Sequence, residues 1–231
     1  MQVFGIAEQY AHFGRQPTVD VRLAKKGAMN MARVRDVEAQ EVDTDLQPIY
    51  QKYGKEYGPF MNQVRVFAHR PVLLKHMMGM LLEMADESVV KKRHLEIALV
   101  TVSKINECRY CVAHHAPRLI ANGLSAKTID HILEPDCPNL DSVDKLVRDY
   151  AIQVTTDSKL VSDSIFSRLR VEFTEAQLVE LTFRIALCGF YNRFNEALQI
   201  EIEDGVLEDL LAKGGTLDNL PSGPVTLANQ L

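Results

Sequence analysis

Residues 96–125 read EIALVTVSKINECRYCVAHHAPRLIANGLS, and this stretch decides both the fold class and where to look for a site. Apolar residues recur at helical spacing on either side of the two cysteines, and Asn122-Gly123 supplies a left-handed stop. We predict one helix over residues 88–103 and a second that begins after an Asn106 cap and ends at Asn122. The pattern is typical of an all-α protein.

Helical spacing continues on both sides of this stretch, and we find no series of alternating segments joined by hairpin dipeptides. Upstream, we expect helices over residues 44–57 and 62–68 and another that starts at Pro71. Downstream, we expect helices to begin at four capping residues, the last of which opens a long helix over residues 175–203: Ser125, Asp141, Ser162 and Thr174. The predicted fold is an all-α multi-helix bundle.

The length of the chain, 231 residues, suits one large domain with appendages. We place a single all-helical domain at residues 31–212. Residues 1–30 form an N-terminal extension whose membership of the fold the sequence leaves open, and Met31 is a candidate translation start. Residues 213–231 are rich in Gly, Pro and Ser, which predicts a C-terminal tail.

Composition and charge exclude several classes of protein. The 26 Lys and Arg residues oppose 31 Asp and Glu residues, and the resulting net charge of −5 provides no electrostatic footprint for nucleic acid. No segment approaches the ~18 uninterrupted apolar residues of a membrane helix, and the N-terminus lacks the pattern of a secretory signal peptide. We therefore expect a cytoplasmic protein without nucleic-acid or membrane partners.

Cys108, Cys111 and His115 share one helical face, because the second and third follow the first by three and seven residues. A place in the first helical turn exposes a cysteine to unpaired N–H groups, which favour the nucleophilic thiolate. A Cys-x-x-Cys pair can also close a disulfide once one sulfur is oxidised, and a histidine one turn further on can hold or move the thiol proton. The spacing favours redox or thiol chemistry.

Metal binding and simple packing are the alternatives for a lone Cys-x-x-Cys pair. Structural zinc takes four ligands, but Cys137 and Cys188 are isolated residues. Haem attachment requires a histidine directly after the second cysteine, where this chain has Val112. We therefore predict no metal ion and no bound cofactor.

Glu96 precedes the first cysteine by twelve residues, and His115 follows the second by four. In type and spacing, these two residues and the cysteines resemble the motif of alkyl hydroperoxidase D-like proteins in the carboxymuconolactone decarboxylase superfamily. The resemblance covers about residues 31–203. It implies an all-helical fold, a homo-oligomer (dimer, trimer or hexamer), and a thiol-dependent peroxidase that reduces hydrogen peroxide or organic hydroperoxides.

The resemblance also implies a role for each residue of the motif. Cys111 is expected to attack the peroxide, and Cys108 to resolve the resulting sulfenic acid by forming a Cys108–Cys111 disulfide. His115 and Glu96 are expected to relay the proton of Cys111. An external dithiol reductant, such as a lipoyl adaptor, a thioredoxin-like protein or a small thiol, would then reduce the disulfide.

One position departs from the pattern, because the best-studied peroxidases of this family carry another histidine immediately before the second cysteine, where this chain has Tyr110. Tyr110 and His114 are therefore auxiliary candidates.

Two other functions stay open. Glu96 and His115 could act as acid and base on a small carbonyl or lactone substrate, although carboxymuconolactone decarboxylases themselves generally lack the cysteine pair. The thiols could also switch a redox sensor or scaffold that does not turn over.

Overall fold

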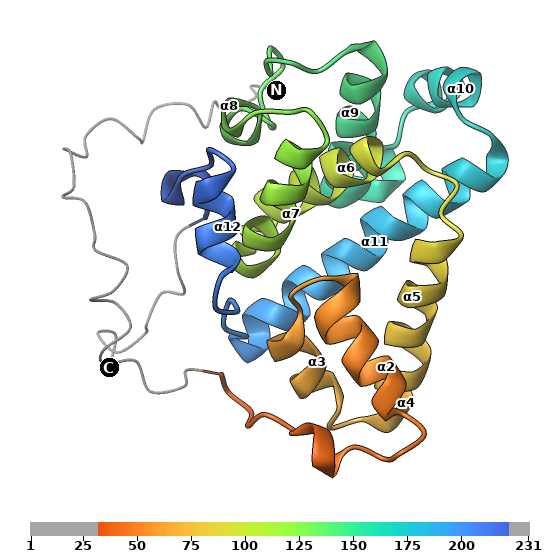
Figure 1. The fold of residues 1–231 in the computed structure, drawn as a ribbon. Helices are drawn as coiled ribbons and strands as arrows, with labels where there is room; N and C mark the ends of the chain where they lie inside the picture. The colour runs from red at the N-terminus through yellow and green to blue at the C-terminus, as the bar shows by residue number, and fades with distance from the viewer. Residues whose placement is uncertain (1–31, 222–231) are drawn as a thin grey trace, which may run out of the picture. The chain divides into compact units, whose positions relative to one another are not determined.

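The computed structural model describes residues 32–221, and every regular element in this range is a helix (Figure 1). The all-α prediction is thus confirmed for this part of the chain. The predicted N-terminal extension, the candidate start at Met31 and residues 222–231 of the predicted tail lie outside the described residues. Within the described range, no helix combines the length and apolarity that a membrane span requires.

The helices are short in the first part of the chain and longer in the second. The first part contains α2 (Gln47–Gln51), a π-helical continuation (Lys52–Tyr57), α3 (Met61–Phe67), α4 (Pro71–Leu73), a second π-helical segment (Leu74–Met78) and α5 (Gly79–Asp86). The second contains α6 (Lys92–Ile105), α7 (Arg109–Ala121), α8 (Ala126–Asp130), α9 (Ser142–Asp157), α10 (Asp163–Glu172), α11 (Glu175–Leu198) and α12 (Val206–Ala212). Three 3-10 turns complete the described range: Ala39–Glu41, Ser158–Leu160 and Leu217–Asn219.

All four downstream caps form as predicted. The side chains of Ser125, Asp141, Ser162 and Thr174 each accept a hydrogen bond from a backbone N–H in the first turn of the helix that follows. Gly123 adopts a left-handed φ of 88°, as expected for the stop after α7. These local signals therefore fix where most of the helices begin and end.

The long helix α11 ends at Leu198 and not near residue 203, as the sequence predicts. Gln199 takes a left-handed φ of 52°, and its N–H bonds back to the carbonyls of the last turn. The chain then turns back, and the carboxylate of Glu203 comes to lie against α7. The early stop thus moves an acidic residue from a predicted helix to the neighbourhood of the cysteines.

Residues 213–221, which the sequence assigns to a tail, pack against the bundle. The Lys104 ammonium donates to the carbonyl of Asn219 at 2.6 Å, and Arg109 donates to the carbonyl of Pro221 at 2.9 Å. Leu220 is buried. A single 3-10 turn produces no helical period, so the sequence pattern does not reveal this packing.

The described residues contain two hydrophobic clusters, and α7 contributes to both. The larger cluster joins α6 with α7, α9 and α11, and Figure 1 shows α11 running beside α6 and α7. The smaller cluster is built from α2, α3, α5 and the end of α11, and it includes Cys108, Tyr110 and Cys111. Val112 and Ala113, the next residues along the helix, belong to the larger cluster. The cysteine pair therefore lies at the boundary between the two clusters.

Candidate active site

Cys108 ends one helix and begins the next. After α6, Glu107 takes a left-handed φ of 53°, and the N–H groups of Glu107 and Cys108 bond to the carbonyls of Lys104 and Ser103. This is a Schellman ending with a residue other than glycine at the left-handed position. Because that conformation is unfavourable for a side chain with a Cβ atom, backbone strain lies directly beside the cysteine pair.

The cap of α7 is Cys108, and the prediction of Asn106 is wrong. The Cys108 sulfur accepts the backbone N–H of Cys111 at 3.4 Å, while the Asn106 amide donates to Asn192 on α11 at 2.9 Å. The Schellman ending leaves no room for a cap two residues earlier. Cys111 therefore occupies the third position of the helix, within the positive end of its dipole. Of the N–H groups of this first turn, that of Cys111 donates to the Cys108 sulfur and that of Arg109 to Glu196.

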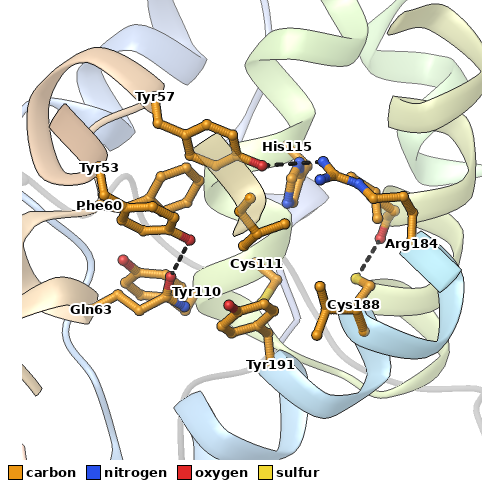
Figure 2. A pocket seen from close by; sticks show the side chains of 13 residues that line it. Tyr53, Tyr57, Phe60, Gln63, Tyr110, Cys111, His115, Arg184, Cys188 and Tyr191 are labelled. Carbon is orange, nitrogen blue, oxygen red and sulfur yellow. Dashed lines mark hydrogen bonds between the residues drawn. The ribbon is translucent and has the colours of Figure 1, made fainter. Parts of the chain in front are cut away.

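Cys111 lines a cavity of about 50 Å³, and aromatic side chains form much of its wall (Figure 2). Its wall is formed by residues of several elements, among them Tyr53, Tyr57, Phe60, Tyr110, His115, Arg184, Cys188 and Tyr191. A water molecule needs ~10–15 Å³ of such space, so the cavity has room for a few waters or one small solute. The sulfur is thus reachable by small molecules only.

The three cysteines near this cavity differ in accessibility and in acidity. Cys108 is fully buried and does not line the cavity, and its side-chain hydrogen bond with Cys111 together with burial holds the pKa of its thiol well above the usual range. Cys188 lines the cavity, but burial raises the pKa of its thiol to about 12. Cys111 and Cys188 are therefore the sulfurs that the cavity reaches, and Cys108 is held beside Cys111 as a protonated thiol.

His115 and Glu96 form the pair that the family resemblance implies. Nδ1 of His115 lies 2.8 Å from Oε2 of Glu96, across the contact between α7 and α6. Burial lowers the pKa of His115 and outweighs the opposite effect of the Glu96 carboxylate. A neutral ring that donates its Nδ1 proton to a carboxylate presents Nε2 as an acceptor, and His115 lines the Cys111 cavity. His115 is thus equipped to receive a proton there.

Asn195 contacts the Cys111 sulfur, and the sequence analysis missed it. Its Nδ2 donates to Sγ of Cys111 at 3.3 Å from the last turn of α11. No local spacing connects two residues that are 84 positions apart. A buried polar residue on an otherwise apolar helix face is the one signal that could have indicated it.

The two auxiliary candidates, Tyr110 and His114, turn toward Glu203. The Tyr110 hydroxyl donates to Oε1 of Glu203 at 2.7 Å, and Nε2 of His114 lies 2.7 Å from Oε2. Nδ1 of His114 lies 2.7 Å from the Tyr110 carbonyl, and Nε2 also faces the carbonyl of Pro59 at 3.0 Å. Because carbonyls only accept, these contacts assign a proton to each ring nitrogen. His114 does not line the cavity.

A second, larger cavity of about 560 Å³ lies behind part of the wall of the Cys111 cavity. Tyr57 and Arg184 line both, whereas Glu96 lines only the larger one. Arg184 donates to the Tyr57 hydroxyl at 3.1 Å, and Figure 2 shows this pair beside His115. The two shared residues lie between the small cavity and the large one.

No group of three or more His, Cys, Asp or Glu side chains within residues 32–221 is arranged to hold a metal ion. The four cysteines are all free thiols. What the site offers instead is a nucleophilic sulfur, a second thiol beside it, an acceptor nitrogen and a carboxylate.

Residues 71–140, which hold the entire motif, match the model of the carboxymuconolactone decarboxylase family. This part of the chain is similar to that family. The carboxymuconolactone decarboxylase segment runs from α4 to the loop before α9, so Asn195, Glu203 and Arg184 lie outside it. No curated protein matches the sequence.

Solved structures show that the described chain has an alkylhydroperoxidase D-like fold. The alkylhydroperoxidase AhpD core of an uncharacterized peroxidase-related protein from Ralstonia eutropha JMP134 is 20% identical, with a TM-score of 0.68 over 84% of this chain and 100% of that chain. A second uncharacterized peroxidase-related protein, from Silicibacter sp. TM1040, is 16% identical, with a TM-score of 0.58 over 79% of this chain and 95% of that chain. A cysteine-to-alanine variant of the debrominase Bmp8, in complex with 2,3,4-tribromopyrrole, is 16% identical, with a TM-score of 0.63 over 80% and 98%. At identities of 16–20%, these similarities show a shared fold and nothing more specific.

Proposed function

We propose that this chain is a thiol-dependent peroxidase that reduces hydrogen peroxide or small organic hydroperoxides through Cys111 and Cys108. The observation that carries the proposal is the position of Cys111, whose sulfur lines a small cavity together with His115, while the thiol of Cys108 lies directly beside it. Thiol peroxidation needs these parts and no others within the protein: a reachable thiolate, an acceptor for its proton and a second thiol.

In the first step, Nε2 of His115 takes the proton of Cys111, and Glu96 stabilises the resulting imidazolium. The thiolate attacks one oxygen of the peroxide. A sulfur–oxygen bond forms, the O–O bond breaks, and the leaving alkoxide or hydroxide takes the proton from His115. Cys111 becomes a sulfenic acid, and the peroxide is reduced to an alcohol or water.

In the second step, the Cys108 sulfur attacks the sulfenic sulfur of Cys111. A disulfide forms and water leaves with the proton of Cys108. The buried Cys108 thiol need not ionise in advance, because its proton can pass to the departing hydroxyl group. An external dithiol then reduces the disulfide and restores both thiols. The reductant and the homo-oligomer that the family resemblance implies are parts of the proposal.

The size of the cavity favours small peroxides over bulky substrates. About 50 Å³ accommodates hydrogen peroxide, but a halogenated aromatic such as the tribromopyrrole bound to Bmp8 would require side chains of the wall to move. Two polar groups of the wall can bind peroxide oxygens. Arg184 presents a guanidinium, and the hydroxyl of Tyr191 is buried without a hydrogen-bond partner among residues 32–221.

The proposal is tested by mixing reduced protein with one equivalent of hydrogen peroxide and following thiol loss, peroxide loss and the disulfide formed, by peptide mass spectrometry. We expect a Cys108–Cys111 disulfide. Cys111→Ser should abolish peroxide consumption, and Cys108→Ser should allow one oxidation but no recycling by a dithiol. Cys137→Ser, which changes a buried thiol outside the cavity, is the matched control and should behave as the unaltered protein.

Other outcomes would assign another function. Undiminished peroxide consumption in Cys111→Ser would overturn the proposal. Turnover of a lactone or carbonyl substrate that survives removal of both cysteines would favour the acid–base enzyme, with His115 and Glu96 as its catalytic pair. Disulfide formation that changes the assembly state without catalytic peroxide consumption would favour a redox sensor.

A further inference from the structure

A chain of three hydrogen bonds ends on the Cys111 sulfur. The Tyr53 hydroxyl donates to Oε1 of Gln63 at 3.0 Å, and Nε2 of Gln63 donates to Oδ1 of Asn195 at 3.0 Å. Nδ2 of Asn195 then donates to Sγ of Cys111 at 3.3 Å. Gln63 and Asn195 are 3% and 1% exposed, so bulk water cannot replace either amide.

The direction of these bonds decides what they do to the sulfur. Each amide accepts at its oxygen and donates at its nitrogen, so the chain presents N–H to Cys111. Burial holds the pKa of Tyr53 well above its usual range, and its hydroxyl therefore keeps the proton that it donates to Gln63. A hydrogen bond from an amide to sulfur favours the thiolate over the thiol, because only the thiolate gains a strong charge-assisted bond.

We propose that Asn195 is a catalytic residue that stabilises the thiolate of Cys111, and that Gln63 and Tyr53 are positioning residues that hold its amide with the nitrogen toward the sulfur. This arrangement draws on elements far apart in the sequence: the π-helical segment after α2, then α3, and finally the end of α11. The benefit of this arrangement to peroxide reduction rests on the proposed function. Its effect on the reactivity of the Cys111 thiolate can be measured without any peroxide chemistry.

The expected signature is a change in how the reactivity of Cys111 depends on pH. Hydrogen bonds to charged groups are strong enough that loss of one should move the midpoint of thiolate formation to higher pH by about one to two units. At neutral pH the reaction should slow by about 3–15-fold, because the loss of thiolate outweighs the higher reactivity of the thiolate that remains. At high pH, a thiolate without the hydrogen bond is more basic and should react about 2.5–10-fold faster, since nucleophilicity rises with basicity. The pH profile of a variant without the hydrogen bond should therefore cross the profile of the unaltered protein. Structural damage to the site would not produce such a crossing.

The experiment measures the alkylation rate of Cys111 by iodoacetamide across a range of pH, with the site of alkylation read by peptide mass spectrometry. Iodoacetamide reports the thiolate and requires no peroxide chemistry. Asn195→Leu removes the donor at similar volume. We expect its profile to shift to higher pH and to cross that of the unaltered protein.

Two further variants test the chain without removing the amide that touches sulfur. Gln63→Glu supplies a carboxylate that only accepts, so Nδ2 of Asn195 should turn to it and present Oδ1 to Cys111. This variant should shift the profile nearly as far as Asn195→Leu. Tyr53→Phe deletes only the distant hydroxyl and should shift it least. Both variants nearly preserve side-chain volume, so they remain informative if Asn195→Leu does not fold.

Asn192→Leu is the matched control. Asn192 is fully buried on the same helix, but its amide contacts Ser103, Asn106 and the sulfur of Cys188 and does not contact Cys111. We expect an unchanged pH profile. An unshifted profile in folded Gln63→Glu and Asn195→Leu, or an equal shift in Asn192→Leu, would overturn the inference. A shifted profile in a protein that consumes no peroxide would overturn the proposed function and leave the role of Asn195 standing.

Discussion

His114 and His115 are neighbours on α7, and each pairs with a carboxylate from a distant part of the sequence. His115 uses Nδ1 for Glu96 and keeps Nε2 for the Cys111 cavity. His114 uses Nδ1 for the Tyr110 carbonyl and Nε2 for both Glu203 and the Pro59 carbonyl. The two pairs are almost equally short, at 2.8 and 2.7 Å. What distinguishes them is the nitrogen that remains available.

The difference shows that a histidine–carboxylate contact does not by itself identify a proton-transfer group. A ring with both nitrogens occupied connects pieces of structure, in this case α7, the loop before α3 and the segment after α11. A ring with one nitrogen facing a cavity can exchange a proton with what enters it. We therefore expect substitutions at one pair to change rates, and substitutions at the other to change stability.

The largest expected effect is that of His115→Gln on chemistry. Loss of a general base typically lowers a rate by ~10²–10⁴-fold, so oxidation of Cys111 by peroxide should slow by that order at neutral pH. Stopped-flow measurement of thiol loss would show it. His114→Gln is the matched change, and we expect it to slow the oxidation far less while lowering the unfolding temperature more. Equal rate losses in the two variants would contradict the comparison.

Glu203→Leu should produce the largest loss of stability. The substitution leaves His114, the Tyr110 hydroxyl and the backbone N–H of Asn62 without their shared acceptor in a buried place. Removing one partner of a buried ion pair costs about 3–5 kcal/mol, which denaturant unfolding would measure. Glu203→Gln retains an acceptor oxygen of the same shape and should cost clearly less. A Leu variant as stable as the Gln variant would show that this network contributes little.

The pH dependence of peroxide oxidation should reflect the buried state of His115. Its pKa is lowered from the ordinary value of 6.5, so the ring stays neutral, and competent as a base, as the pH falls through 6.5. We expect the acid limb of the rate profile to lie below that value. Glu96→Gln removes the charge that raises the pKa of His115, so the limb should move to still lower pH. An acid limb above 6.5 would contradict the assignment of His115 as the base.

The smallest effects should come from two tyrosines on opposite sides of the comparison. Tyr191→Phe removes the unpartnered hydroxyl of the cavity wall and should slow peroxide oxidation by about 2–10-fold, the worth of one neutral hydrogen bond, with little change in stability. Tyr110→Phe removes a donor to Glu203 and should instead cost about 1–2 kcal/mol of unfolding free energy. Kinetics and denaturant unfolding would be measured for both variants. A slower oxidation in Tyr110→Phe together with a lower stability in Tyr191→Phe would contradict the assignment of one histidine pair to catalysis and the other to stability.

The sequence predicts the part of the site that lies within one helix and the helix before it. Cys108, Cys111 and His115 follow one helical face, so regular spacing was sufficient for these three. Glu96, whose carboxylate lies 2.8 Å from His115, was indicated only by the family resemblance. Asn195, Glu203 and Tyr191 reach the same place from the C-terminal third, where only tertiary packing decides which residues meet. Glu203 was misplaced for a definite reason, because the apolar period continues past Leu198 while the left-handed Gln199 ends the helix.

The fold class and most helix starts were predictable because caps are local signals, and four of them formed as expected. The start of α7 was not. Its cap depends on a left-handed residue, Glu107, that local preference disfavours and that the Schellman ending of α6 enforces. Sequence reasoning thus missed the helix start beside the cysteines, as it also missed the start of α12 at Val206.

The position of the cysteine pair between two hydrophobic clusters has a consequence for newly made chains. Cys111 belongs to the smaller cluster, whereas its neighbour Val112 and the carboxylate-bearing helix α6 belong to the larger one. A folding intermediate that has completed only one cluster lacks either the wall of the cavity or the support for His115 and Glu96. The arrangement of cysteine pair, cavity wall and proton acceptor is therefore complete only when both clusters have formed.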